Sequence, residues 1–220
     1  MDITFSGHSC FHLRGRTTDL ITDPFPLNTD SSINEASANV ITVSHAHQGH
    51  CYTEGVAGEG RVVAGPGEYE VRGAIIRGIS SFHDSERGKS RGRNTVFTLE
   101  IDGLRLAHLG DIGHMPSAKL MEALKGLDVL FVPVGGHSTI TPEEAAQVVR
   151  QLRPRVAIPM HYATGTSPSP LCGVESFLEA SGAGAAPGEG DNSTAARPRL
   201  SVSPSTLPPA PQIVVLSRSR

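Results

Sequence analysis

Three histidines lie close together in residues 44 to 50, SHAHQGH, directly after a short apolar run. Residues two apart in an extended segment project to the same side, so His45 and His47 can bind one metal ion from the end of a strand. Gly49 allows the chain to turn, which brings His50 toward the same centre from another direction. The spacing therefore indicates a metal site, and its alternative is a solvated histidine-rich turn.

Three further side chains that can bind a metal follow apolar runs elsewhere in the chain. They are His83 in SFHDS, Asp111 in HLGDIGH and His161 in IPMHYAT. Loops gather along the rims of a sheet and often carry functional side chains there. We therefore expect these residues to lie along one rim of the sheet together with the histidine cluster.

Apolar runs with strand character supply the elements that must position these side chains. Turn residues separate the runs, as expected of a strand-rich chain. We expect a meander in the first half and helix–strand alternation in the second. The runs are residues 3–5, 10–13, 19–22, 40–43, 61–64, 74–79, 95–101, 104–109, 128–134 and 155–160.

Two helices carry start signals. Thr141, Pro142 and Glu144 offer a hydroxyl cap, a proline at the first helical position and a glutamate that can close a capping box. This predicts a helix to about Leu152, with one apolar face that can lie on a sheet. A second helix is expected from Pro116 to near residue 126.

Length and composition suit one domain. The 220 residues are 38% hydrophobic, enough to bury a continuous core, so residues 1–220 are predicted to form a single domain. From residue 181 the composition shifts to Gly, Ala, Ser and Pro, which predicts a flexible insertion at 181–198. Strand character returns near the end, and residues 212–217 are predicted to form a closing strand at a sheet edge.

Charge and cysteine content narrow the function class. A formal net charge of -3 gives no overall basic field, so nucleic acid is not an expected partner. The three cysteines have no CxxC spacing, which argues against a disulfide framework. The chain has neither a signal-peptide pattern nor a run of about 18 apolar residues, so we expect a cytoplasmic protein that does not enter a membrane.

Several short motifs together resemble a known family. GHSCF at 7–11, TDPF at 22–25, HxHxxH at 45–50, His83, GD at 110–111 and PMH at 159–161 occur in the order of the metallo-β-lactamase fold hydrolases. The resemblance covers residues 1 to about 164 and the last strand. It implies an α/β (α+β) fold, a four-layer αββα sandwich of two mixed β-sheets flanked by helices. A narrower resemblance, carried by VPVGGHSTITPEEAA and PMHY, is to the small bacterial branch similar to the L-ascorbate-6-phosphate lactonase and its uncharacterised relatives.

The resemblance also implies roles for individual residues. Asp111 bridges two metal ions, and Asp111 and His161 are assigned to catalysis. Asp23 accepts a hydrogen bond from a ligand imidazole, although a turn-capping aspartate before Pro24 is an equally good interpretation. The implied metal ligands are His45, His47 and His83 for the first ion and His50 and His161 for the second, with Asp111 shared.

Position 49 departs from the family pattern. The family has HxHxDH, whose aspartate binds the second metal and orients the attacking water, but this chain has Gly49. We therefore expect the second ion to bind more weakly. Zinc is the expected cofactor, as one or two ions, and manganese or iron is admissible because Asp111 supplies oxygen. Cys51 is not expected to replace the missing acid, since a free cysteine more often serves as a small buried hydrophobe.

Other histidines are assigned to the rim or to the core. His8 and His137 are candidates for binding substrate, and His114 is a further candidate on the same rim. A polar turn residue satisfied by backbone is the alternative for His8. His108 is predicted to be a core imidazole and His12 a surface one.

Four cations lie in residues 87–93, RGKSRGR, soon after His83. Together with two metal ions they create a positive potential that favours an anionic substrate, so Arg91 and Arg93 are also predicted to bind substrate. The alternative is a solvated loop. Phosphodiesterase action on nucleic acid rests on these cations alone, without a further domain to bind a strand.

The preferred hypothesis is a metal-dependent hydrolase that attacks an ester, lactone or phosphoester bond through a metal-bound hydroxide. The alternative, from a different class, is a metal-binding or ligand-sensing protein of the hydrolase fold with weak or no turnover, suggested by Gly49. A small-molecule substrate is the expected partner, and a homo-oligomer is left open.

Overall fold

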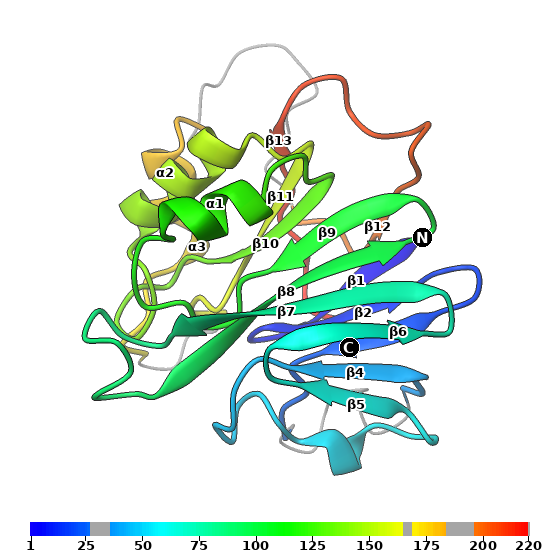
Figure 1. Cartoon of the computed structure of the whole chain (residues 1–220). Coiled ribbons are helices and arrows are strands. Elements are labelled where there is room, and N and C mark those ends of the chain that lie inside the picture. The colour runs from blue at the N-terminus through cyan, green and yellow to red at the C-terminus, as the bar shows by residue number, and fades with distance from the viewer. Residues whose placement is uncertain (27–35, 165–168, 184–195, 220) are drawn as a thin grey trace.

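Two mixed β-sheets make up most of the computed structural model, which describes residues 1–26, 36–164, 169–183 and 196–219 (Figure 1). The first sheet contains β1 (Asp2–Gly7), β2 (Cys10–Arg14), β3 (Asp19–Thr22), β4 (Val40–Val43), β5 (Arg61–Ala64) and β12 (Leu200–Ser201). Its order is β12-β1-β2-β3-β4-β5, antiparallel as far as β3 and parallel from β3 to β5.

The second sheet has seven strands. They are β6 (Gly67–Val71), β7 (Ala74–Phe82), β8 (Arg93–Ile101), β9 (Leu104–His108), β10 (Val129–Pro133), β11 (Val156–Met160) and β13 (Gln212–Ile213). The order is β13-β11-β10-β9-β8-β7-β6, antiparallel from β6 to β9 and parallel beyond.

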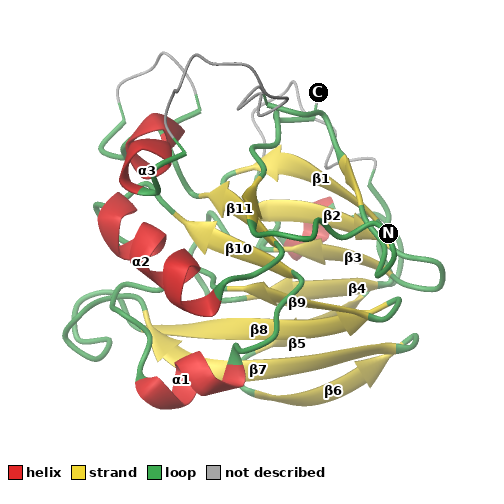
Figure 2. Cartoon of the chain, turned by 90° about the horizontal axis from the view of Figure 1, so that it is seen from above, coloured by secondary structure: helices red, strands yellow, loops and turns green. Residues whose placement is uncertain are grey.

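Three helices, α1 (Ala118–Ala123), α2 (Pro142–Leu152) and α3 (Val174–Ala180), lie together on the outer face of the second sheet (Figure 2). Leu120, Val148 and Phe177, one from each helix, are buried in a cluster with side chains of that sheet. None of the described helices is long and apolar enough to cross a membrane.

The main core lies between the two sheets. Phe11 of the first sheet and Phe131 of the second are both fully buried, with ring centroids 4.4 Å apart. Side chains alternate along the strands, so the two faces of the first sheet pack in different clusters. Leu20 belongs to the main core, whereas the adjacent Ile21 packs on the opposite face. Apolar alternation thus makes each sheet two-sided and stacks the layers.

The predicted fold class is confirmed, since the chain forms two mixed sheets with few helices. On the outer face of the first sheet, the described part of the chain supplies a loop that contains a 3-10 turn at Thr53–Gly55. His12 is a correction: it was expected at the surface but is buried, because β2 lies between β1 and β3 inside a sheet that is covered on both faces.

The helix predictions are confirmed to different degrees. The helix predicted from Thr141 to Leu152 is α2, with the expected capping box. The other predicted helix is shorter, because Ser117 caps α1 and the helix ends at Ala123. The third helix, α3, was not predicted, because its N-cap Gly173 has no side chain to signal a helix start.

The C-terminal segment is only partly covered by the structure. Residues 184–195, most of the predicted flexible insertion, lie outside the described residues. The predicted closing strand at 212–217 is shorter than expected, since β13 spans Gln212–Ile213 and pairs in parallel with β11. Beyond β13, the backbone of Arg218 forms an isolated parallel β-bridge with that of Phe5, so this part of the chain returns to the first sheet.

The cap of α2 supports a first prediction. Thr141 Oγ1 accepts a hydrogen bond from Glu144 N at 3.2 Å, and Glu144 Oε2 accepts one from Thr141 N at 2.8 Å. Replacing Thr141 by alanine should lower the free energy of unfolding in urea by about 1 kcal/mol. Gln147→Ala, at an exposed position of the same helix, is the control and should change it by less than about 0.5 kcal/mol. Equal stability of Thr141→Ala and the wild type would show that the cap contributes nothing.

Candidate metal centre

Six strand ends converge to form the candidate site. His8 follows β1, Asp23 follows β3, the 45–50 segment follows β4, and His83 directly follows β7. Asp111 follows β9 and His161 follows β11. These strands run in the same direction within each sheet, so their carboxyl ends meet at one edge. The fold therefore brings together residues that lie far apart in the sequence.

One oxygen of Asp111 is the centre of the cluster. Asp111 Oδ2 lies 3.0 Å from His161 Nε2, 3.2 Å from His50 Nε2, 3.4 Å from His83 Nε2 and 3.9 Å from His45 Nε2. All five side chains are buried, so no more than a small part of each is open to solvent. Four imidazoles thus face a single carboxylate oxygen.

Three groups of possible ligand atoms lie around this carboxylate, and one of them, Asp23 with His45 and His50, overlaps the other two. The nitrogens of His45, His47 and His83 lie within 4.8 Å of one another. Those of His50, His161 and His8 do so as well. The first group is the one that the resemblance implies for the first ion, whereas the second contains His8 in addition to the two expected histidines.

Asp23 and Ser44 orient two of the imidazoles. His50 Nδ1 donates to Asp23 Oδ2 at 2.9 Å, and Ser44 donates to Asp23 through its backbone N at 2.7 Å and its Oγ at 2.5 Å. Ser44 Oγ also lies 2.9 Å from His45 Nδ1. Contacts at the Nδ1 atoms leave the Nε2 atoms of His50 and His45 to face the centre, an arrangement common around metal ligands. The contact made by Asp23 is the one that the resemblance implies.

Two positioning residues were not identified from the sequence. Ser44 is one, and its only sequence signal is a hydroxyl placed between β4 and the first histidine. Asn94 is the other: its Oδ1 accepts from Asp111 N at 3.0 Å, and its Nδ2 donates to Leu109 O at 2.9 Å. Asn94 lies on β8, so its contact with the Asp111 loop exists only after the strands pair.

The neighbouring loop residue Gly110 explains the GD motif. Its φ is 56°, and a Cβ added there would collide with Asn94 Oδ1 and Ser44 Cβ. A side chain at this position therefore conflicts with the two residues that hold Asp111 and Asp23.

The electrostatics of the cluster favour a charged Asp111. Burial opposes its ionisation, but His50 and His161 outweigh burial and hold the pKa of Asp111 well below its usual range. Burial alone lowers the pKa of His50, yet the Asp111 and Asp23 carboxylates raise it to about 10. Burial, followed by the neighbouring His50, lowers the pKa of His45 to about 3. His45 is therefore neutral near pH 7, the form in which imidazole binds a metal, whereas His50 is protonated and would release a proton on binding one.

The cluster can hold a metal ion. Within the described part of the chain, the buried His45 Nε2 and Asp111 Oδ1 have no hydrogen-bond partner. Buried polar atoms normally have one, so two unpaired atoms within the imidazole cluster fit the ligands of a cation. Nitrogen and carboxylate oxygen are also the ligands that zinc takes in catalytic sites.

Backbone strain gathers at the same place. His8, Asp23 and His161 have φ values of 56°, 39° and 52°, in the left-handed region that side chains rarely adopt. His161 N donates to His8 O at 2.7 Å, which ties two of these residues together. Residues held in such conformations tend to cluster at functional sites.

The cationic loop lies beside the first group of ligands. Asp84 accepts hydrogen bonds from the backbone N of Glu86, Gly88, Ser90 and Arg91 at 2.7–3.0 Å, so its carboxylate organises the loop and is not available to the cluster. Arg91 is exposed and close enough to help lower the pKa of His83, after the larger effect of burial. Its predicted contact with substrate stays a prediction.

Two other predicted substrate residues are exposed near the site. Arg93 begins β8 and pairs with Phe82. His137 follows β10 with a φ of 58°. Its loop passes beside His161, because a Cβ at Gly135 would collide with His161 O. Their contacts with substrate stay predictions.

Two further histidines have structural contacts. His114 Nε2 accepts from Phe82 N at 3.3 Å and His114 Nδ1 lies 2.8 Å from Met115 O, so both ring nitrogens are engaged within the protein, and the suggested substrate contact stays a prediction. His108 is buried and bonded to Ser9 O at 2.9 Å, which confirms the core imidazole.

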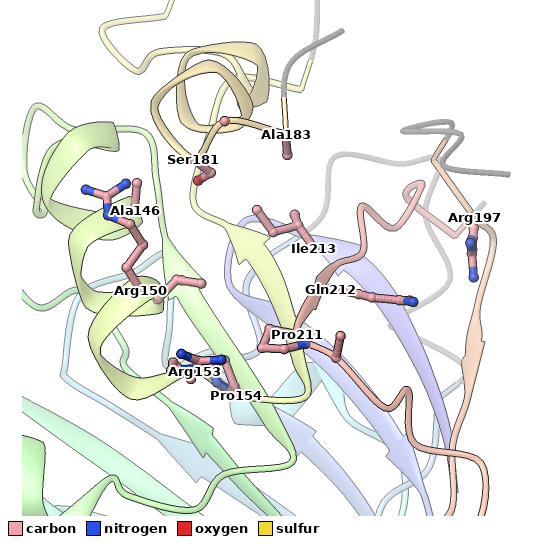
Figure 3. Close-up of a pocket in the computed structure, with 13 residues that line it drawn as sticks. Ala146, Arg150, Arg153, Pro154, Ser181, Ala183, Arg197, Pro211, Gln212 and Ile213 are labelled. Atoms are coloured by element: carbon pink, nitrogen blue, oxygen red, sulfur yellow. The ribbon is translucent and has the colours of Figure 1, made fainter. Parts of the chain in front are cut away.

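Two cavities lie at opposite ends of β11. One of about 430 Å³ is lined by His8, Gly49, Tyr162 and Arg218 among others, so it opens beside the second group of ligands. A larger one of about 820 Å³ lies near Arg150, Arg153 and Ile213, between α2 and β13 (Figure 3). None of the predicted site residues lines the larger cavity, and the smaller one is the candidate substrate pocket.

Comparison with known proteins gives a consistent result. The pattern of the beta-lactamase superfamily domain matches residues 2–161. The chain is 33% identical over 194 residues to a UPF0173 protein of Pyrococcus furiosus, a match that covers 77% of this chain and 87% of the relative. It is 30% identical over 190 residues to a UPF0173 metal-dependent hydrolase of Thermococcus onnurineus, which covers 74% and 84%.

A solved structure shows the same likeness over the whole chain. The crystal structure of a protein from Thermotoga maritima, described as a Zn-dependent hydrolase of the metallo-beta-lactamase superfamily, has a TM-score of 0.75 and 34% identity. The match covers 98% of this chain and 97% of that chain. These relatives carry UPF0173 and hydrolase names, so the narrower likeness to the ascorbate-phosphate lactonase stays a prediction.

Proposed function

The chain belongs to the beta-lactamase superfamily, its relatives are metal-dependent hydrolases, and we propose that it hydrolyses an ester, lactone or phosphoester bond in a small anionic molecule. The observation that carries this proposal is the contact of four imidazole nitrogens with one oxygen of Asp111. A carboxylate in that position can serve two cations at once and balance part of their charge.

The proposed division of labour follows the two ligand groups. His45, His47 and His83 would hold the first ion and His50 and His161 the second, with Asp111 shared between them. Divalent ions held by these residues would lower the pKa of bound water to about 7, so that hydroxide would be available near neutral pH, and would polarise the oxygen of the scissile group. Asp23 keeps His50 in the tautomer whose Nε2 faces Asp111. Asp111 and His161 are thus the proposed catalytic residues.

Zinc is the proposed metal. Five imidazoles and one carboxylate suit zinc better than magnesium or calcium, which prefer oxygen ligands. Manganese and iron remain admissible alternatives, since Asp111 contributes oxygen. Metal analysis of protein purified without added metal identifies the ion.

The test of the reaction is a screen with zinc-loaded protein. Lactones, carboxylic esters and phosphoesters are assayed in matched anionic and neutral pairs, with Asp111→Asn as the blank. Turnover above the blank on any of these classes is the expected result. Rates equal to the blank across the panel would contradict the proposed reaction.

The cationic loop supports a prediction about substrate charge. The double variant Arg91→Ala/Arg93→Ala should raise KM for an anionic substrate by up to about 5-fold and leave KM for its neutral analogue unchanged, because exposed charge pairs contribute up to about 1 kcal/mol. Arg16→Ala is the control, since Arg16 is exposed and pairs with Asp102 outside the cluster. An equal change in KM for both substrates would show that the loop does not distinguish substrates by their charge.

A second candidate function is metal binding or ligand sensing with little turnover. The glycine at position 49, where the family has an acid, is the observation that favours it. Tight zinc binding without hydrolysis of any tested class would support this alternative.

The proposed compartment is the cytoplasm and the proposed partner a small molecule. Cys10, Cys51 and Cys172 are all free thiols, which suits a reducing environment. Whether copies of the chain associate is tested by light scattering.

A further inference from the structure

The space next to Gly49 is filled by a histidine ring. A Cβ built on Gly49 would lie 2.9 Å from His8 Nε2 and 3.3 Å from His8 Cδ2. A Cβ–nitrogen distance below 3.0 Å requires one of the groups to move. A side chain at position 49 and the present position of the His8 ring therefore exclude each other.

The His8 ring also faces the second group of ligands. Its centroid lies 4.6 Å from that of His50 and 4.5 Å from that of His161. The ligand atoms of the three residues are within 4.8 Å of one another, close enough for one ion.

The backbone holds His8 in this place. Its φ of 56° is the left-handed conformation, and its carbonyl oxygen accepts the 2.7 Å hydrogen bond from His161 N. The two histidines are thus fixed relative to each other although β1 and β11 belong to different sheets. A polar turn residue, the alternative interpretation of His8, does not need this connection to His161.

We propose that His8 replaces the missing acid of position 49 and supplies an imidazole ligand to the second ion, beside His50, His161 and Asp111. The inference rests on the proposed two-metal function and adds His8 to the ligands of the second ion. The second ion would then have three imidazole ligands, the number of protein ligands usual for catalytic zinc, in addition to the carboxylate shared with the first ion. His8 is a metal ligand in this account and not a substrate-binding residue.

The replacement has a consequence for the choice of metal. An imidazole brings nitrogen and no charge where an aspartate brings oxygen and a negative charge. Nitrogen ligands favour zinc over manganese more than oxygen ligands do. The site also keeps one more positive charge, which suits an anionic substrate.

The test is an exchange of the two positions. Zinc stoichiometry is measured by equilibrium dialysis and elemental analysis, and affinity by competition with a chromophoric chelator. Three proteins are compared, namely the wild type, His8→Gly and His8→Gly/Gly49→Asp. Glycine is chosen because it adopts the φ of residue 8 without strain.

The wild type should bind two zinc ions. His8→Gly should keep the first ion and bind the second at least about 10-fold more weakly, a loss no smaller than that seen when an outer partner of a metal ligand is removed. The exchanged double variant should recover the second ion, with a higher affinity for manganese relative to zinc than the wild type. His12→Gln removes an imidazole of β2 outside the cluster and should keep both ions.

Three results would overturn the proposal. They are a wild type that binds a single ion, a His8→Gly variant with unchanged affinity for both ions, and a double variant whose affinity for the second ion stays as low as that of His8→Gly. Thermal unfolding of each variant shows whether the fold is kept. Zinc counting does not depend on turnover, so His8 can be a ligand in a protein that hydrolyses nothing, and hydrolysis can occur without His8 as a ligand.

Discussion

Asp111→Asn is expected to lose both metal ions and to reduce hydrolysis to the level of the chelated wild type. The amide keeps the shape of the carboxylate but not its charge. It therefore cannot offer an anionic oxygen to the ions that the four surrounding imidazoles would hold. Two divalent ions close together then lack the only carboxylate among the proposed ligands. Zinc content after dialysis and turnover of the best substrate measure the two effects.

A matched control separates the site from the fold. Asp19→Asn makes the same chemical change at the start of β3, at the opposite end of the strand from Asp23. It should keep both zinc ions and full turnover. If Asp111→Asn retains two ions, Asp111 is not the shared ligand and the proposed centre is wrong.

Asp23→Asn is expected to lower the affinity for the second ion by about 10- to 100-fold, the usual effect of removing the hydrogen-bond partner of a ligand histidine. Asp23 is fully buried and bonded to His50 and Ser44. Asparagine suits its φ of 39° and can keep one bond to Ser44, but it no longer accepts charge-assisted bonds. Competition titration with zinc measures the effect, and an unchanged second affinity would favour the turn-capping interpretation.

The same residue gives a dependence of stability on pH. Burial opposes ionisation of Asp23, but its bonds from His50 and Ser44 and the nearby His108 hold the pKa below the ordinary 3.8. A carboxyl group whose pKa is lower in the folded chain stabilises the fold above about pH 4, and this stabilisation is lost as the pH falls through the folded pKa. Acid unfolding followed by circular dichroism should show a weaker dependence in Asp23→Asn than in the wild type.

The sequence was sufficient to predict where the site would form. His83, Asp111 and His161 each follow an apolar run, and parallel strands of one sheet end at the same edge, so their convergence follows from the order of the runs. The helix from Pro142 to Leu152 was predictable for a local reason, since its cap, its proline and its glutamate are adjacent in the sequence.

Features that depend on pairing between distant strands were not predictable. Asn94 contacts Asp111 only because β8 lies beside β9, and His12 is buried only because β2 lies between two other strands. The missing acid at position 49 suggested a weakened second site. The ring of His8 lies within 3 Å of the place where that side chain would begin, a proximity that residues 41 positions apart do not reveal in the sequence.

Anomalous diffraction from crystals soaked in zinc is the most direct measurement of the central claim. Two peaks are expected, each about 2.0–2.2 Å from an oxygen of Asp111, the usual distance from zinc to a carboxylate. One should lie beside His45, His47 and His83 and the other beside His50 and His161. A fully zinc-saturated crystal with no peak at this cluster would contradict the account.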